Sequence, residues 1–374
     1  MQKLLKVICL LCVVFLFCAC ILLTQPVRAQ NTVTATITGL TQPDCVAITT
    51  NGEYAYVTNL GGNLVSVINT ATNNVTTTIP VGNYPASVAI TPNGAYAYVT
   101  NPESNTTSVI STATNTVTTT VTGFSRPEGV AVTPDGKYVY VTNIGGNTTS
   151  VISTATNAVT ATVTGLGHPE DVAVTPNGAY AYVTNHGSNL VSVINTATNT
   201  ITANVTVGNN PWHVAVAPNG KYVYITNGYS NSVSVISTAT NAVTTTITGL
   251  SDPVGLALTP NGAYAYITNP ELGSVSVMST ATNTVTANVT VGNNPVSVAV
   301  TPNGAYAYVT NIGTGSDTVS VISTATNTAT TINVVEPVIL IIAIAIVLIL
   351  IILILIILLW QRHNKKKTQP TKIT

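Results

Sequence analysis

The chain has 374 residues, of which 6% are charged, against roughly a quarter in an average soluble domain. The formal net charge is zero, yet all 11 acids lie between residues 30 and 337, where only three bases accompany them. This middle part is therefore acidic, with a net charge of −8. We predict no nucleic-acid partner, since such binding needs a basic patch, and the low charge content argues against an ordinary cytosolic enzyme.

Residues 1–29 have the order of a secretory signal peptide. Two lysines precede an apolar run over residues 7–23, and Ala29 offers a small residue for cleavage before Gln30. The run is long enough that an uncleaved signal anchor stays an alternative. Four of the five cysteines lie in this segment, so Cys45 would have no partner for an intramolecular disulfide in the mature chain.

The middle of the chain is a repeat of 42 residues in seven copies. Its most regular motif is Tyr-Val/Ile-Thr-Asn, with the tyrosines at Tyr56, Tyr98, Tyr140, Tyr182, Tyr224, Tyr266 and Tyr308. A proline (Pro43 to Pro295) and a glycine (Gly52 to Gly304) keep the same period. Three registers held over seven copies cannot arise by chance.

Each unit carries four alternating, β-branched segments separated by Asn-Gly, Gly-Ser-Asn and Ala-Thr-Asn turns. In the fourth unit these segments are 171–175, 179–185, 190–195 and 200–206. Alternation and short turns predict a four-stranded antiparallel meander, and a four-stranded unit of this length is typical of a propeller blade. The sequence thus predicts an all-β, seven-bladed β-propeller over residues 30–327.

Closure of the ring is predicted from the two ends of the array. An isolated strand segment, 31–38, stands before the first proline, and the seventh unit ends in a degenerate copy, 328–334. We expect the N-terminal strand to complete the last blade, because this hides two unpaired edges. Residues 328–337 would then form a short stalk.

A transmembrane helix is predicted over residues 338–360, which contain no polar side chain apart from the tryptophan at the end. A helix of this length reaches about 34 Å, against about 30 Å for the hydrocarbon core. The basic tail, 361–374, contains Arg362 and a run of lysines, which places it on the cytoplasmic side. We expect a single-pass membrane protein with an extracellular N-terminal domain.

The run Thr-Pro-Asn-Gly-Ala-Tyr-Ala-Tyr-Val-Thr-Asn, followed by Val-Ser-Val-Ile-Ser-Thr-Ala-Thr-Asn, resembles the YVTN family of β-propeller repeats in microbial surface-layer proteins. The resemblance extends through all seven units. It implies the propeller fold. It does not imply one function, since similar propellers serve as surface proteins, lactonase-like enzymes and domains of redox enzymes.

Candidate ligand-binding residues lie beside the repeated proline, where the copies differ. These loops lead into the first strand of each unit, which the resemblance implies is the innermost, so their side chains should surround one mouth of the central channel. The candidates are Arg126, Glu128, His168, Glu170, Asp171, Trp212, His213 and Asp252. They could form a polar recognition surface, could bind a metal or act in catalysis, or could be unselected variation in loop tips.

No metal-binding spacing, nucleophile elbow or phosphate loop occurs in the sequence, so we predict no catalytic residue, metal or cofactor. Other unusual residues fall in the loops that follow the second strand of each unit, and we expect them on the opposite face of the ring: Glu103, His186, Tyr229 and Glu271.

Two further patterns concern the blades themselves. Fourteen of the 16 tyrosines are paired, as in Tyr180 and Tyr182, and we expect both rings of a pair to pack between blades. Asn-x-Thr triplets suggest N-glycosylation at Asn74, Asn105, Asn147, Asn204 and Asn288. Glycans on the Thr-rich outer strands would shield their edges; otherwise those edges could pair with neighbouring molecules.

The leading function is a membrane-anchored surface-layer or adhesion protein without catalysis. Its partners would be cell-surface proteins or glycans. One alternative is a receptor that binds a ligand at the channel mouth, and another is an extracellular lactonase-like hydrolase.

Overall fold

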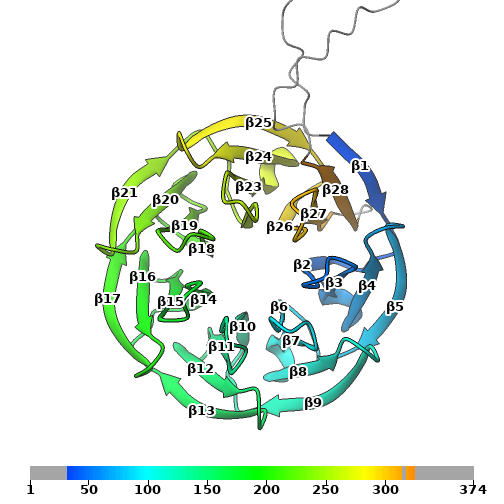
Figure 1. Cartoon of the computed structure of the whole chain (residues 1–374), viewed down its shortest axis with the longest axis horizontal. Coiled ribbons are helices and arrows are strands. Elements are labelled where there is room, and N and C mark those ends of the chain that lie inside the picture. Colours follow the sequence, from blue (N-terminus) through cyan, green and yellow to red (C-terminus); the bar gives the residue numbers. More distant parts are fainter. Residues whose placement is uncertain (1–31, 314–316, 325–374) are drawn as a thin grey trace, which may run out of the picture. The chain divides into compact units, whose positions relative to one another are not determined.

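A computed structural model describes residues 32–313 and 317–324. They form seven four-stranded antiparallel sheets arranged in a ring around a central axis (Figure 1). The predicted all-β, seven-bladed propeller is confirmed. In every complete repeat the first strand lies innermost and the fourth outermost (Figure 1).

Each blade is one sheet, and the blades are numbered in chain order. Blade 1 contains β2 (Pro43–Ile48), β3 (Tyr54–Asn59), β4 (Leu64–Asn69) and β5 (Asn74–Pro80); blade 2 contains β6 (Val88–Ile90), β7 (Tyr96–Asn101), β8 (Thr106–Ser111) and β9 (Thr116–Thr122). Blade 3 contains β10 (Pro127–Val132), β11 (Tyr138–Asn143), β12 (Thr148–Ser153) and β13 (Ala158–Val163); blade 4 contains β14 (Pro169–Val174), β15 (Tyr180–Asn185), β16 (Leu190–Asn195) and β17 (Thr200–Thr206). Blade 5 contains β18 (Pro211–Val216), β19 (Tyr222–Asn227), β20 (Ser232–Ser237) and β21 (Ala242–Ile247); blade 6 contains β22 (Leu256–Leu258), β23 (Tyr264–Asn269), β24 (Ser274–Ser279) and β25 (Thr284–Thr290). Blade 7 contains β26 (Pro295–Val300), β27 (Tyr306–Asn311), β28 (Thr318–Ser323) and β1 (Thr32–Ile37). Three short 3-10 helices follow second strands: η1 (Leu60–Gly62), η2 (Pro102–Ser104) and η3 (Pro270–Leu272).

The ring closes through blade 7, whose strands come from both ends of the repeat array. Strand β1 pairs antiparallel with β28, from Thr32 opposite Ser323 to Ile37 opposite Val319. The N-terminal strand therefore occupies the outermost place in the last blade, and β28 has no open edge at this position.

The hydrophobic core is divided among the spaces between neighbouring blades. Between blades 4 and 5, for example, Tyr182 and Val193 pack with Val223 and Ile225, and all four side chains are fully buried. Burial of a side chain of this kind stabilises the fold by about 1.5–3 kcal/mol. The ring is thus held together by a series of similar interfaces rather than by one central core.

Only the second tyrosine of each pair packs fully between blades. Tyr182 is completely buried, whereas Tyr180 remains 36% exposed and stands at the first position of β15. The expectation that both rings pack between blades is wrong for five of the seven pairs, because there the first ring lies at the end of the strand, beside the hairpin and the solvent. In blades 1 and 6 the first ring, Tyr54 or Tyr264, is partly buried against the core.

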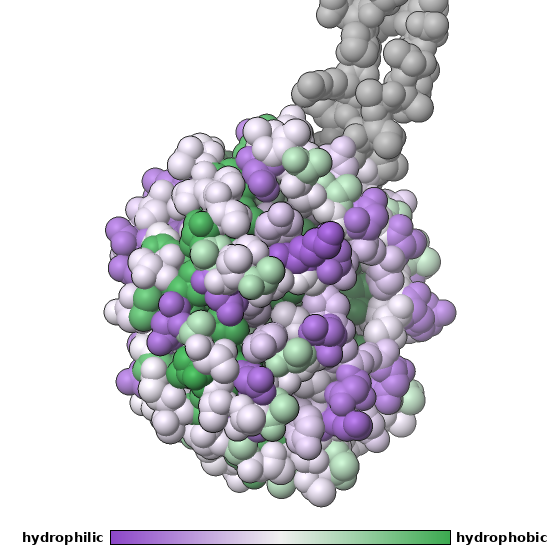
Figure 2. All heavy atoms as spheres, turned by 60° about the vertical axis from the view of Figure 1, so that its left-hand side comes forward, coloured by the Kyte–Doolittle hydropathy of each residue, from purple (hydrophilic) through white to green (hydrophobic). Residues whose placement is uncertain are grey.

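The face visible in Figure 2 is mostly of intermediate hydropathy, with strongly hydrophilic side chains in separate spots and hydrophobic ones mainly on the left. This agrees with a chain of which only 6% of the residues are charged. Four predicted segments lie outside the described residues: the signal peptide (1–29), the stalk (328–337), the transmembrane helix (338–360) and the tail (361–374). Within residues 32–313 and 317–324, no helix has the length and apolar character to cross a membrane.

Candidate functional site

Two sets of loops meet at one face of the ring. Because β14 and β15 are antiparallel, Pro169 at the start of β14 pairs with Asn185 at the end of β15. The loop before a first strand and the loop after a second strand therefore lie together, and the other blades repeat this arrangement.

The prediction that the loops after the second strands lie on the opposite face is consequently wrong. Glu103 and His186 line the same hollow as Arg126 and His168. Glu271 accepts a hydrogen bond from the Ser251 hydroxyl, at 2.7 Å, next to Asp252. The loop of Tyr229 is held to the loop before β18 by a backbone bond from Gly228. Antiparallel pairing of the first two strands brings these segments to one edge.

The threonine of the Tyr-Val-Thr-Asn motif fixes the backbone of this face. In blade 4, the Thr184 hydroxyl accepts a hydrogen bond from the backbone N–H of Asp171 (3.0 Å) and donates one to the carbonyl of Trp212 (2.8 Å) in blade 5. The corresponding threonine donates to the next blade at all seven interfaces. The repeated motif thus positions the variable residues that follow the prolines.

Two hollows share three lining residues, Glu128, Glu170 and Trp212, and together we call them the acidic mouth. The narrow hollow is about 150 Å³ and is lined by residues from all seven blades, so it lies on the ring axis. The wide hollow is about 810 Å³ and is lined by blades 2 to 5, including Tyr84, Arg126 and His168.

The structure brings seven of the eight sequence candidates into the acidic mouth. Arg126 and His168 line the wide hollow, Asp171 and His213 line the narrow one, and Glu128, Glu170 and Trp212 line both. Asp252 lines neither hollow. It lies in blade 6 close to Gly228, which also approaches the Trp212 ring.

Among the other residues that line the mouth, four carry an acidic, phenol or imidazole side chain: Asp44, Tyr84, Glu103 and His186. Asp44 and Tyr84 stand next to repeated prolines, which are the same variable positions that the sequence candidates occupy. The location of Glu103 and His186 follows from the antiparallel pairing of the first two strands, which brings the loop after the second strand beside the loop before the first.

Acidic side chains outnumber basic ones in the mouth. Five carboxylates line it against a single guanidinium, that of Arg126: Asp44, Glu103, Glu128, Glu170 and Asp171. Burial raises the pKa of Asp44 and of Glu170 to about 7. The pKa of Glu128 is raised well above its usual value by burial and then by the nearby charge of Glu170. The folded chain thus holds acids whose ionisation a bound cation would favour.

Asp171 and His213 form an ordered pair in the narrow hollow. The Asp171 carboxylate accepts a hydrogen bond from the backbone N–H of Val214 (3.0 Å) and lies 3.5 Å from Nε2 of His213. Nδ1 of His213 is buried and has no hydrogen-bond partner among the residues that the structure describes. Cys45 lies in the same hollow, where burial raises the pKa of its thiol to about 11 and keeps it unreactive.

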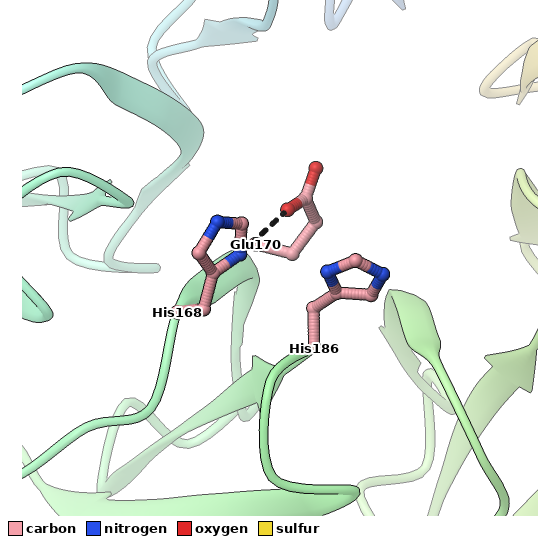
Figure 3. A group of neighbouring side chains, drawn as sticks. All are labelled: His168, Glu170 and His186. Atoms are coloured by element: carbon pink, nitrogen blue, oxygen red, sulfur yellow. Dashed lines mark ion pairs between the residues drawn. The ribbon is translucent and has the colours of Figure 1, made fainter.

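A second polar group stands at the rim, where His168, Glu170 and His186 face one another (Figure 3). Nδ1 of His168 lies 4.0 Å from Oε2 of Glu170. The ring centroids of His168 and His186 are 5.4 Å apart, and those of His186 and Trp212 are 5.0 Å apart. Burial, followed by the neighbouring His168, lowers the pKa of His186, which favours its neutral, ligand-competent form.

The five candidate glycosylation sites all have exposed side chains. Asn74, Asn204 and Asn288 lie on outermost strands. Asn105 and Asn147 lie in the loops after second strands, with left-handed backbones. Within the described part of the chain their amide nitrogens donate no hydrogen bond, which leaves them accessible for modification.

Comparisons with known proteins agree with this fold. The model of a YNCE-like beta-propeller matches residues 172–272, and that of a lactonase, 7-bladed beta-propeller, matches residues 111–203. The hydrazine synthase of Kuenenia stuttgartiensis has a similar structure, with a TM-score of 0.72 and 25% identity, over 78% of this chain and 97% of that one. No curated protein matched the chain. The chain therefore contains segments similar to two propeller families and has the architecture that these families share.

Proposed function

We propose that this protein is a non-catalytic binding module at a cell surface, and that its acidic mouth takes up a small cationic ligand. The observation that carries the proposal is the composition of the mouth, with five carboxylates against one guanidinium. Opposite charges in a concave, partly desolvated site attract a cation strongly.

The size and aromatic content of the mouth support a small ligand. Its wide hollow of about 810 Å³ falls within the usual range for small-molecule sites. Tyr84 and Trp212 offer ring faces beside the carboxylates, and such faces attract ammonium and guanidinium groups.

The cell-surface setting is supported by the sequence alone. The signal peptide predicted over 1–29, the membrane span predicted over 338–360 and the resemblance to YVTN surface-layer repeats all favour it. In that setting the propeller faces outward as a surface-layer or adhesion component, and the mouth is its recognition site.

The test is calorimetric titration of the full-length protein, in detergent and EDTA, with putrescine, spermidine, lysine, arginine and choline. We expect at least one amine to bind, and Glu128→Ala to weaken its binding about tenfold or more. Alanine is the residue that blade 2 carries at this position, Ala86. Asp135→Asn, in the hairpin between β10 and β11, is the control and should bind normally. The absence of binding for all five amines would overturn the proposal.

A lactonase-like hydrolase is the second candidate, because the lactonase family match over 111–203 includes His168, Glu170 and His186. Its test is turnover of a panel of sugar lactones. Turnover by the wild type that is lost in His168→Asn would replace the non-catalytic proposal, and absence of turnover would exclude this candidate.

A further inference from the structure

We propose that His168, Glu170 and His186 bind one divalent transition-metal ion at the rim of the acidic mouth. This inference rests on the proposed function, since it names a specific cation for that site. One nitrogen from each imidazole and one carboxylate oxygen lie within 4.8 Å of one another, and the three side chains converge from a loop, a strand and a turn (Figure 3).

The type of donor selects the metal. Two imidazoles and one carboxylate suit Zn²⁺ and its neighbours in the first transition row, whereas Ca²⁺ and Mg²⁺ prefer a full set of oxygens. Three protein ligands leave one position of a tetrahedral ion free. Because Glu170 and His186 line the wide hollow, that position would be open to a small ligand.

Binding requires only small side-chain movements. Donor atoms on a tetrahedral Zn²⁺ lie about 3.3 Å apart when the bonds are about 2.0–2.1 Å long. The present separations, up to 4.8 Å, must therefore shorten by up to about 1.5 Å. All three side chains are partly exposed, which leaves room for their rotation.

The backbone already holds the two histidines together. The N–H of His186 donates to the carbonyl of His168 (3.0 Å), and the N–H of Gly187 donates to the carbonyl of Gly167 (3.2 Å). The N–H of His168 donates to Oδ1 of Asn147 (2.8 Å) in the previous blade. A Cβ atom at position 187 would lie 3.2 Å from Cβ of His168, so Gly187 permits this close approach.

The group belongs to blade 4 alone and is not part of the repeated architecture. At the position of His168 the other blades carry Gln42, Tyr84, Arg126, Asn210, Asp252 and Asn294. At the position of His186 they carry Leu60, Pro102, Ile144, Gly228, Pro270 and Ile312. Convergence of two histidines and a glutamate therefore needs an explanation other than the requirements of the propeller.

The surrounding charges favour a cation on balance. The charge of Arg126 acts on Glu170 and opposes a metal ion. Asp44 and Asp171 act on the same carboxyl group with negative charge, and Glu128 lines the same hollow. Three neighbouring acids thus face one guanidinium, and a bound cation would favour the ionised forms of Asp44 and Glu128, whose pKa values are raised by burial.

The test is titration of the full-length protein, purified without a histidine tag and after EDTA treatment and removal, with ZnCl₂ alone. We expect one ion per chain, bound in the micromolar range or tighter. The variant with His168→Asn and His186→Ile should bind at least about tenfold more weakly. These substitutions introduce residues that other blades carry at the same positions, such as Asn210 and Ile144, and thermal melting verifies that the fold is retained.

His363→Asn is the control variant, since the fourth histidine lies in the predicted tail and should not affect binding. Cu²⁺ gives a second readout, because an ion bound by His186 would lie close to Trp212 and should quench its fluorescence in the wild type but not in the double variant. Equal Zn²⁺ affinity in the wild type and the double variant would overturn the inference, as would an absence of binding at millimolar Zn²⁺. Amine binding in EDTA would then still support the proposed function, so the two failures are distinguishable.

Discussion

The hydroxyl of Tyr182 donates a hydrogen bond of 2.8 Å to Oδ1 of Asn241, although the two residues are 59 positions apart. Tyr182 lies in the second strand of blade 4, and Asn241 lies in the turn before the outermost strand of blade 5. The same bond joins other blades, and the one from Tyr308 to Asn73 (2.7 Å) crosses the closure of the ring. Where this bond forms, the second tyrosine of a pair contributes both a buried ring and a polar link to the next blade.

Replacement of this tyrosine by phenylalanine should destabilise the propeller in a way that depends on the blade. Tyr182→Phe leaves Oδ1 of Asn241 without its donor, and we expect a loss of about 1–2 kcal/mol in the free energy of unfolding. Tyr224→Phe is the matched control, because Oδ1 of the corresponding Asn283 already has no hydrogen-bond partner within the described part of the chain. Denaturant unfolding measures both. An equal loss in the two variants would show that the hydrogen bond contributes little.

The threonine of the repeated motif should affect the site only where it supports a site residue. Thr142 accepts from the N–H of Gly129 (2.7 Å) and donates to the carbonyl of Glu170 (2.8 Å). Thr268 makes the same contacts with Gly255 (2.7 Å) and Val296 (3.0 Å). Each Thr→Val substitution should cost about 1–3 kcal/mol of stability, since both backbone groups lose a partner.

Only Thr142→Val should also weaken Zn²⁺ binding, by several-fold, because it releases the backbone of Glu170. Urea unfolding and ZnCl₂ titration of the two variants measure the two effects separately. A similar loss of Zn²⁺ affinity in Thr268→Val would contradict a local effect on Glu170.

Most of the fold follows from the sequence because the same local patterns occur in all seven repeats. The alternation from Leu190 to Asn195 predicts a strand, and Asn177-Gly178 predicts the hairpin between the first two strands of the blade. The 42-residue period then predicts the same strand and hairpin in the other blades. The pairing of residues 32–37 with blade 7 could also be anticipated, because an isolated strand segment at the start of an array has few other places to pair.

The site was predicted only in part, for two physical reasons. The expectation that His186 lies on the opposite face of the ring is wrong because β15 runs antiparallel to β14, so the loop after β15 lies beside the loop before β14. The contact between His168 and His186 also depends on a left-handed backbone at His168 (φ 58°) and on the close approach at Gly187. The sequence pattern around either histidine contains neither of these features.

Glycosylation of the outer strands is testable on protein from native membranes. Asn204 and Asn288 have exposed side chains, and Oδ1 of each already accepts a serine hydroxyl at 2.7 Å, which leaves the amide group directed away from that bond. We expect mass spectrometry to find glycans at one or both, and Asn204→Gln with Asn288→Gln to remove them. Peptides that contain both residues at their unmodified mass would contradict the prediction.

Asp44 should make the propeller less stable as the pH rises through neutrality. Its pKa is raised from 3.8 to about 7 by burial, so between these values the folded state binds more protons than the unfolded state. Stability is then highest near the unfolded pKa, falls as the pH increases, and stops changing above the folded pKa. Glu128 and Glu170 act in the same direction, because burial raises the pKa of each.

We expect the metal-free protein to lose about 1–3 kcal/mol of unfolding free energy between about pH 5 and pH 8, since one pKa unit corresponds to about 1.4 kcal/mol and solvent in the hollow screens part of the effect. Asp44→Asn should reduce this slope. Asp135→Asn should leave it unchanged, because hydrogen bonding to Thr133 lowers the pKa of Asp135 and places its titration below this range. Urea unfolding at a series of pH values measures the slope, and an identical slope in Asp44→Asn and the wild type would contradict the role of this buried carboxyl.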